Sequence, residues 1–225
     1  MPEVPDTIWM RREHARVGRP AERSRAELTS VAIAVADSDG LDAVSMRRVA
    51  AELGTGPASL YRYVASRDDL LDLMADSVAA EFELTGPTGD WLADLLDVGW
   101  QAREIMLRHR WLPGLVINRG ALGPRGADLL EYVLGLLADQ PADGITKVEA
   151  FAMLMAVTAA YVQHEISAGQ AGQQRQAAYL ERVGTDGEHP QIAALLAGPV
   201  SSATHDQDRF ALVLARVLTG LLPQQ

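Results

Sequence analysis

Apolar residues recur along most of this chain at the three- and four-residue spacing of an amphipathic α-helix. The first such face consists of Leu28, Val31, Ala32, Val35 and Ala36. The second consists of Met46, Val49, Ala50 and Leu53. The sequence has no Asn-Gly hairpin turn and no sustained alternation of β-branched with polar residues. The pattern therefore predicts an all-α fold.

Capping and turn residues mark the ends of the helices in the first third of the chain. Asp39-Gly40 is a C-terminal stop for the first helix, and Ser45 suits the N-cap of the second. Pro57 opens a short third helix, because a missing N–H costs nothing at the first helical position. Ser66 with Asp69 three residues later resembles a capping box and opens a fourth helix.

The segment 85–90, Thr-Gly-Pro-Thr-Gly-Asp, is the clearest break in the pattern, and we place a domain boundary near it. Beyond the break, the spacing predicts helices at about 90–109, 124–139, 145–168, 173–183, 189–197 and 206–222. Residues 110–123 contain one proline and three glycines and are expected to be irregular. The chain has no repeat of 20–50 residues.

The second and third predicted helices carry the functional signal. A helix, the tight turn Gly54-Thr55-Gly56 and a second short helix of about eight residues form a helix-turn-helix, whose second helix enters the major groove of DNA. Leu60 and Val64, four residues apart, are expected to pack inward. The opposite side is expected to carry Ser59, Arg62 and Tyr63, with the small Ala58 able to approach a base methyl group.

The charge of the chain is divided in a way that fits this motif. The whole chain carries a net charge of −10, which argues against a protein coated in basic surface. Residues 10–67 nevertheless contain ten arginines and seven acidic residues, whereas residues 68–225 contain ten basic and 21 acidic residues. Only the first third is therefore suited to contact with DNA.

Ten residues are the expected DNA contacts: Ser45, Arg47, Arg48, Pro57, Ala58, Ser59, Tyr61, Arg62, Tyr63 and Arg67. A bidentate arginine–guanine contact contributes about 1–3 kcal/mol of discrimination, and a phosphate contact mainly positions the protein. Each arginine taken alone could instead be a solvated surface residue, and Tyr61 could equally be a core tyrosine. The six arginines between Arg11 and Arg25 could form an arm in the minor groove or belong to a solubilising tail.

The same residues resemble the N-terminal domain of the tetracycline-repressor (TetR) family of bacterial transcription factors. The resemblance rests on the segments 45–54 (SMRRVAAELG), 59–64 (SLYRYV) and 67–71 (RDDLL). It implies phosphate contacts for Tyr61, Tyr63 and Arg67 and a base contact for Arg47. Gly56 stands where the family usually has Ser or Thr, and Ala58 stands where it often has Gly.

The resemblance also implies a domain organisation and a mode of action. We expect an N-terminal arm at 1–19, a three-helix helix-turn-helix domain at 20–67, a connecting helix at 68–84 and a larger helical domain for ligand binding and dimerisation at 85–225. The protein is then a repressor that binds a palindromic operator in double-stranded DNA as a homodimer, and a small molecule releases it. The apolar helix 145–168 and the last helix could form a four-helix dimer interface, or could simply fill the subunit core.

Apolar and aromatic residues with a few polar groups among them are candidates for the ligand pocket, and the effector is therefore expected to be apolar or aromatic. They are Trp100, Met106, His109, Trp111, Asn118, Tyr132, Phe151, Met155, Tyr161 and His164, with Leu115 and Gln101 beside them. Each is also a candidate core residue. His164 and Glu165 are adjacent and do not share a helical face, and no pair of residues has metal-ligand spacing, so we expect no metal and no cofactor.

Other functional classes find little support. The chain has no cysteine, no Gly-x-Ser-x-Gly elbow, no Walker loop and no dinucleotide fingerprint, so an enzyme is not expected. The longest apolar run, residues 150–162, is too short to cross a bilayer, and the N-terminus is no signal peptide. We therefore expect a soluble cytoplasmic protein with no membrane contact. A helical adaptor that binds another protein and no DNA is the alternative.

Overall fold

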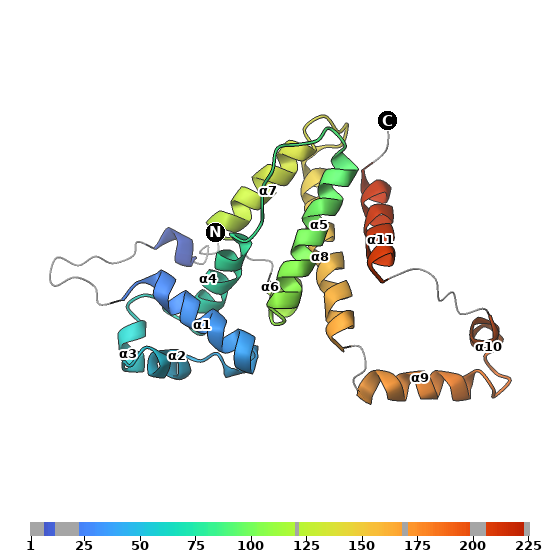
Figure 1. Ribbon diagram of the computed structural model, residues 1–225, viewed down its shortest axis with the longest axis horizontal. Helices are drawn as coiled ribbons and strands as arrows, with labels where there is room; N and C mark the ends of the chain where they lie inside the picture. Colours follow the sequence, from blue (N-terminus) through green and yellow to red (C-terminus); the bar gives the residue numbers. More distant parts are fainter. Residues whose placement is uncertain (1–6, 12–22, 120–121, 168–170, 199–205, 223–225) are drawn as a thin grey trace, which may run out of the picture.

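The computed structural model describes residues 7–11, 23–119, 122–167, 171–198 and 206–222. Within these ranges the chain forms eleven α-helices and two short 3₁₀ helices, with no strand (Figure 1). The all-α fold expected from the apolar spacing is confirmed.

The N-terminal helices form where their caps were expected. Helix α1 is Arg25–Asp39 and ends at Gly40, which has φ +84°, a conformation that glycine adopts without strain. A 3₁₀ turn, η2 (Leu41–Ala43), leads to α2 (Met46–Glu52) and α3 (Pro57–Leu60). Helix α4 (Arg67–Ala79) follows, with its first turn capped by the Ser66 hydroxyl, which accepts from the Asp69 N–H.

The second group of helices is built around α8 (Gly144–Ser167), which packs against α5 (Trp91–Arg108), α6 (Leu112–Arg119) and α11 (Asp206–Leu221). Helix α7 (Pro124–Leu136) contacts α4, α5 and α8. Helices α9 (Ala171–Val183) and α10 (Pro190–Ala197) pack on each other and project from this body (Figure 1). By length and composition alone, α8 could also cross a membrane, but core helices of soluble proteins pass the same test.

Helix α6 corrects the expectation that residues 110–123 are irregular. Pro113 lies in the first turn of α6, where no intrahelical N–H bond is lost. Leu112 and Leu115 are buried, and α6 packs on α8. Tertiary packing therefore outweighs the low helix propensity of the proline and of Gly114.

Two apolar cores hold the helices together. The first joins α1–α4 to α5, α6 and α8, so that Leu70 and Met74 of α4 share a core with Ile105, Met106 and Trp111. The second contains residues of α5, α7, α8 and α11, including Phe210 and Leu214. The first core crosses the sequence break at 85–90, and α4 is the helix through which the two halves of the molecule meet.

The segment Thr7–Arg11 packs on the body of the protein. Its 3₁₀ turn η1 (Ile8–Met10) lies on α4, and the Ile8 side chain is only 1% exposed. Arg11 donates to Asp69 at 2.8 Å, and the Arg25 guanidinium donates to the carbonyl oxygens of Ile8 and Arg11. The burial of Ile8 and these hydrogen bonds hold residues 7–11 of the expected N-terminal arm against the body of the protein. Arg12, Arg16 and Arg19 of the expected arm lie outside the described residues.

Candidate DNA interface and ligand cavity

A tight turn joins α2 to α3. Gly54 has φ +64°, and the Thr55 N–H donates to the Ala50 carbonyl at 2.9 Å, which closes the C-terminus of α2. The Thr55 and Ser59 hydroxyls are 2.8 Å apart, and the Ser59 hydroxyl donates to the Gly56 carbonyl. These bonds link the turn to the first turn of α3 through side-chain hydroxyls.

The regular helix α3 is shorter than expected. It ends at Leu60, and residues 61–63 continue as a turn in which the Val64 N–H donates to the Leu60 carbonyl at 3.2 Å. Leu60 and Val64 are buried, as their four-residue spacing predicted. The outer side of this segment is consequently a helical first turn followed by a looser turn.

Most of the expected DNA contacts lie on one exposed surface of α2 and α3. The exposed members are Ser45, Arg47, Arg48, Pro57, Ala58, Tyr61 and Arg62, and Ser59 is half-buried. Arg48 is paired with Asp39 at 3.2 Å and Glu52 at 3.0 Å, and Ser45 caps α2 by accepting from the Arg48 N–H. Arg47 has no ion pair among the described residues, and Tyr61 is 54% exposed rather than in the core.

Two of the ten residues lie elsewhere. Tyr63 is 6% exposed, so the expectation that its side chain faces outward is corrected: its ring packs in the first core, with the Arg62 guanidinium 5.0 Å from its centroid. Arg67 donates through Nε to the Val44 carbonyl at 2.7 Å and through a terminal nitrogen to the Leu41 carbonyl at 2.8 Å. These bonds fix the η2 turn ahead of α2 and engage the guanidinium inside the domain.

A cavity of about 370 Å³, the α4 cavity, lies between α4 and helices α5–α8. This volume lies within the range of small-molecule sites. One wall is α4 itself, through Leu71, Ala75, Val78 and Ala79. The other walls come from α5–α8 and include Leu112, Leu115, Leu129, Phe151, Met155 and Ala156. A molecule in this cavity would touch the helix that connects it to the DNA-binding half.

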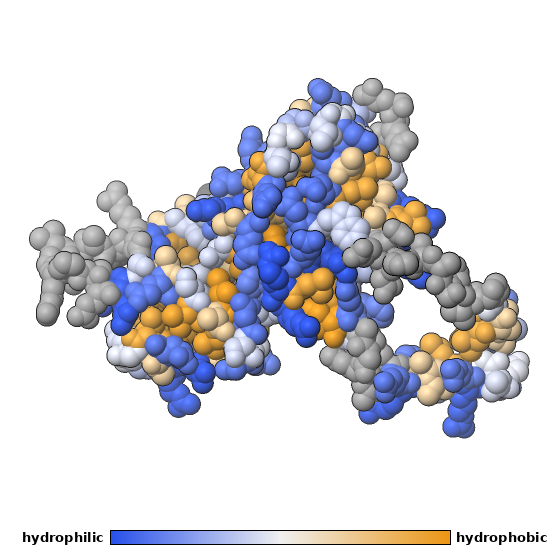
Figure 2. All heavy atoms as spheres, viewed as in Figure 1, coloured by the Kyte–Doolittle hydropathy of each residue, from blue (hydrophilic) through white to orange (hydrophobic). Residues whose placement is uncertain are grey.

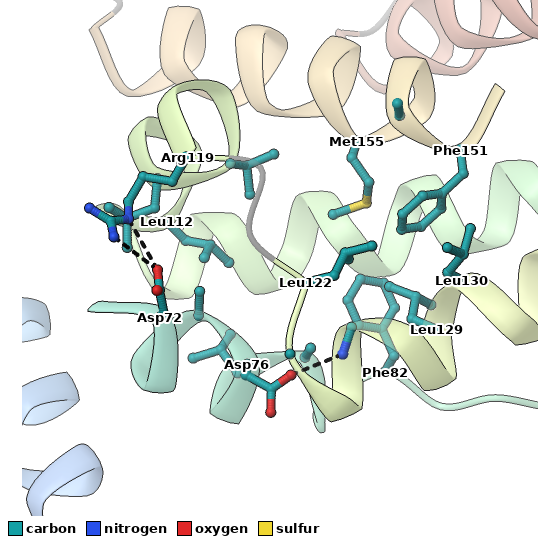
Figure 3. A pocket seen from close by; sticks show the side chains of 18 of the residues that line it. Asp72, Asp76, Phe82, Leu112, Arg119, Leu122, Leu129, Leu130, Phe151 and Met155 are labelled. Carbon is teal, nitrogen blue, oxygen red and sulfur yellow. Dashed lines mark hydrogen bonds and ion pairs between the residues drawn. The ribbon is translucent and has the colours of Figure 1, made fainter. Parts of the chain in front are cut away.

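Three charged residues stand at the α4 side of the otherwise apolar cavity (Figure 3). Asp72 binds Arg119 of α6 at 3.0 Å, and Arg119 also donates to Asp68 at 2.8 Å. Asp76 Oδ1 accepts the N–H groups of Arg125 and Gly126 at 2.9 and 3.0 Å. Because the N-cap of α7 is Gly123, which has no side chain, Asp76 of α4 caps this helix from outside. Burial raises the pKa of Asp76 above its ordinary value, although the two N–H bonds act to lower it.

Few of the expected ligand residues line this cavity. Leu115, Phe151 and Met155 do so, whereas Tyr132 and Gln101 line a separate polar groove beside α5. Trp100 and Tyr161 pack on Phe210, with ring centroids 4.9 and 5.2 Å apart. Met106 is fully buried in the first core, and the exposed Asn118 donates to the Gly114 carbonyl. His164 is exposed on α8.

His109 and Trp111 lie at the junction of the two halves rather than at the cavity. The Trp111 indole donates to Asp37 of α1 at 2.6 Å. The two ring nitrogens of His109 lie 2.8 Å from Asp37 and 2.9 Å from Glu81, which also accepts from Arg108 at 2.6 Å. Burial alone would raise the pKa of Glu81, but the hydrogen bonds from Arg108 and His109 hold it below its ordinary value. These contacts tie the end of α1 to the start of the larger domain.

The cavity residues that the sequence did not single out include Asp72, Asp76 and Phe82. A signal for two of them was present: Asp72 and Asp76 are four residues apart, and so share a helical face with the apolar Ala75 and Ala79. Carboxylates on an otherwise apolar helix face indicate a polar partner on the helix opposite. Here those partners are Arg119 and the N-terminus of α7.

Comparison with known families accounts for both halves of the molecule. Residues 28–74 match the bacterial regulatory proteins of the tetR family, and residues 85–224 match the tetracyclin repressor-like C-terminal domain. The chain belongs to the TetR family. The resemblance seen in the helix-turn-helix residues is thereby confirmed and extends over the larger domain. A TetR-family chain of this kind is a helix-turn-helix transcriptional regulator.

Individual TetR-family relatives agree with this assignment. The transcriptional repressor DrrR1 of Streptomyces coeruleorubidus is 33% identical over 220 residues, which cover 90% of this chain and 80% of the relative. The crystal structure of apo ActR from Streptomyces coelicolor has a TM-score of 0.77 at 32% identity and covers 89% of this chain and 97% of that one. ActR in complex with actinorhodin has a TM-score of 0.74 at 33% identity, with coverage of 88% and 96%.

Proposed function

We propose that this protein is a repressor that binds a palindromic DNA operator as a homodimer and leaves it when a small apolar or aromatic molecule occupies the α4 cavity. The observation that carries the proposal is the position of α4. This helix lines the cavity, shares a core with α1–α3, and is bonded to α6 and α7. A ligand that fits the cavity better when α4 is displaced would therefore move the DNA-binding helices.

General thermodynamics sets how strongly such a ligand must prefer the DNA-free state over the DNA-bound state. To shift the equilibrium from 1:99 to 99:1, a ligand must prefer the released state by about 5.5 kcal/mol. A cavity of about 370 Å³ with an apolar lining is large enough for an aromatic molecule of several rings. The solved complex of ActR with actinorhodin supports a small-molecule effector for this chain also.

The proposed DNA contacts are the exposed residues of α2, of α3 and of the turn that follows α3. Arg47 and Arg62 are the candidates for base and phosphate contacts, Tyr61 for a phosphate contact, and Ala58 for close approach to a base. Two such surfaces in a dimer would lie about 34–36 Å apart, one turn of DNA. We further propose that the protein acts in the cytoplasm and has no catalytic role, in keeping with a relative that is named a transcriptional repressor.

Exposed apolar surface supports the homodimer. Met153 of α8 and Leu212 of α11 are 42% and 46% exposed, on two helices that pack side by side. The projecting α9–α10 pair exposes Tyr179 and Leu195, and Figure 2 shows hydrophobic surface there. A second copy packed in an isologous way would cover such surface. The dimer interface is proposed at this exposed surface of α8–α11. A separate protein partner is not needed to explain the exposed apolar residues.

The experiment is selection of DNA from a random-sequence library, followed by fluorescence anisotropy of the enriched duplex. We expect a palindrome with half-sites about one turn apart. Arg47→Ala should weaken binding about fivefold to 150-fold, since a specific arginine contact contributes about 1–3 kcal/mol. The matched control is Arg125→Ala, an exposed arginine of α7, which should bind as the wild type does. Failure to enrich any sequence would refute the DNA-binding proposal.

Dimerisation is tested by sedimentation velocity. Met153→Glu with Leu212→Glu should convert the dimer to a monomer, because four like charges would face one another in the proposed interface. Ile117→Glu makes the same change at an exposed position of α6 and should leave the dimer intact. A wild-type protein that sediments as a monomer at micromolar concentration would contradict this part of the proposal.

A further inference from the structure

The charged side chains that line the α4 cavity include more carboxylates than cations. The charged residues among its described lining are Asp72, Asp76 and Arg119. Arg119 is already engaged by two carboxylates, those of Asp72 and Asp68, so its positive charge is more than balanced. The α4 side of the cavity therefore has an excess of negative charge before any ligand enters.

Asp76 adds to that excess in a way that no neighbouring side chain cancels. Its described hydrogen bonds come from two backbone N–H groups, those of Arg125 and Gly126. No arginine or lysine makes an ion pair with it among the described residues. The exposed Arg125 and Asp128 of α7 act on it only over a longer distance and in opposite senses. The raised pKa of Asp76 is the expected response of a carboxylate held against apolar walls without a cationic partner.

The rest of the cavity offers a ligand almost nothing but apolar contact. The walls opposite α4 are built from leucine, isoleucine, valine, phenylalanine, methionine and alanine side chains, with Phe151 and Met155 facing the charged side across the cavity (Figure 3). Low-dielectric walls strengthen the interaction between a charge inside them and the carboxylates at the rim. The cavity is thus apolar over most of its surface and acidic along one side.

From this arrangement we infer that the effector of this protein is an apolar, aromatic-sized molecule that carries a hydrogen-bond donor, preferably a protonated amine, on the side that faces Asp72 and Asp76. The inference rests on the proposed function, because it assigns a ligand chemistry to the proposed effector site. An anionic effector is disfavoured, since it would have to displace Asp72 from Arg119 and approach Asp76 as well.

The test uses three probes that share one aromatic body: 9-(aminomethyl)anthracene, 9-(hydroxymethyl)anthracene and anthracene-9-carboxylate. Their binding to the purified full-length protein is followed by anthracene fluorescence without DNA. We expect the ammonium probe to bind at least about tenfold more tightly than the carboxylate, with the alcohol between them. The series on the wild-type protein tests the charge preference without any substitution.

Three variants then test whether the preference for the ammonium probe arises in the cavity and from Asp76. Asp76→Asn keeps an oxygen to cap α7 but removes the charge, and should reduce the ammonium-over-carboxylate ratio several-fold while leaving the alcohol's affinity unchanged. Asp139→Asn, an exposed carboxylate outside the cavity lining, is the matched control and should keep the wild-type ratio. Ala156→Trp fills the cavity and should abolish binding of all three probes.

The outcomes distinguish the inferred ligand chemistry from the proposed effector site. Equal affinity for the three probes, or tighter binding of the carboxylate, overturns the inference and leaves the cavity as a ligand site, with Arg119 as its anchor in the second case. A charge preference that persists in Ala156→Trp also overturns it, because the probes then bind elsewhere. No binding of any probe overturns both the inference and the proposed effector site.

Discussion

The packing of Ile8 predicts that a residue near the N-terminus contributes to stability as a core residue does. The Ile8 side chain is 1% exposed and belongs to the core shared by α1, α4 and α6. Replacing a buried isoleucine with alanine costs about 2–5 kcal/mol. Ile8 lies on a short terminal segment, which can relax around the smaller side chain, so we expect a loss near the lower limit, about 2 kcal/mol.

The assay is urea denaturation followed by circular dichroism at 222 nm, with the free energy of unfolding obtained by linear extrapolation. Met10→Ala is the matched control, because Met10 lies in the same 3₁₀ turn and is 75% exposed. It should change the free energy of unfolding by less than about 0.5 kcal/mol.

The result also decides between two roles for the N-terminal segment. An arm that serves only to contact DNA would make Ile8→Ala as stable as the wild type. A difference below about 0.5 kcal/mol would therefore refute the packing of residues 7–11 against α4 and restore the DNA-arm hypothesis for Arg11.

Four further substitutions have expected effects on stability. Glu81→Gln should lower the free energy of unfolding at pH 7 by less than about 1 kcal/mol. The lowered pKa of Glu81 means that its ionised carboxylate stabilises the fold. The difference between the variant and the wild type should therefore vanish as the pH falls below about 4. Asp76→Asn should behave in the opposite way: its thermal stability relative to the wild type should increase as the pH rises from about 4 towards 7, since the raised pKa makes the ionised carboxylate unfavourable in the folded state. Gly99→Ala should cost about 1–3 kcal/mol in urea denaturation, because a Cβ there would clash with Leu214 of α11. Gly114→Ala in α6, where nothing lies within 4 Å of the new atom, should be neutral or stabilising.

The DNA-binding half could be predicted from the sequence because its determinants are local. The Ser45 and Ser66 caps, the Gly54 turn and the spacing of Leu60 and Val64 each depend on residues a few positions apart. The orientation of Tyr63 could not be predicted in this way, because its burial depends on α1 and α4 packing around it.

The ligand cavity could not be predicted because its lining comes from five successive helices, and only their packing decides which side chains face it. The large aromatic residues were predicted as ligand contacts. Trp100 and Tyr161 instead pack on Phe210, which is distant from both of them in the chain. His109 and Trp111 bind Asp37 across the junction of the two halves. Only the relative placement of the helices distinguishes such packing residues from residues that line a cavity.

The central claim is that occupancy of the α4 cavity weakens operator binding, and one titration tests it directly. The protein is bound to its selected operator duplex, and 9-(hydroxymethyl)anthracene, the uncharged probe, is added while anisotropy reports the DNA-bound fraction. The account predicts that the probe releases the wild-type protein, whereas Ala156→Trp, with its cavity filled, stays bound. Unchanged operator affinity in a wild-type protein saturated with the probe would contradict it.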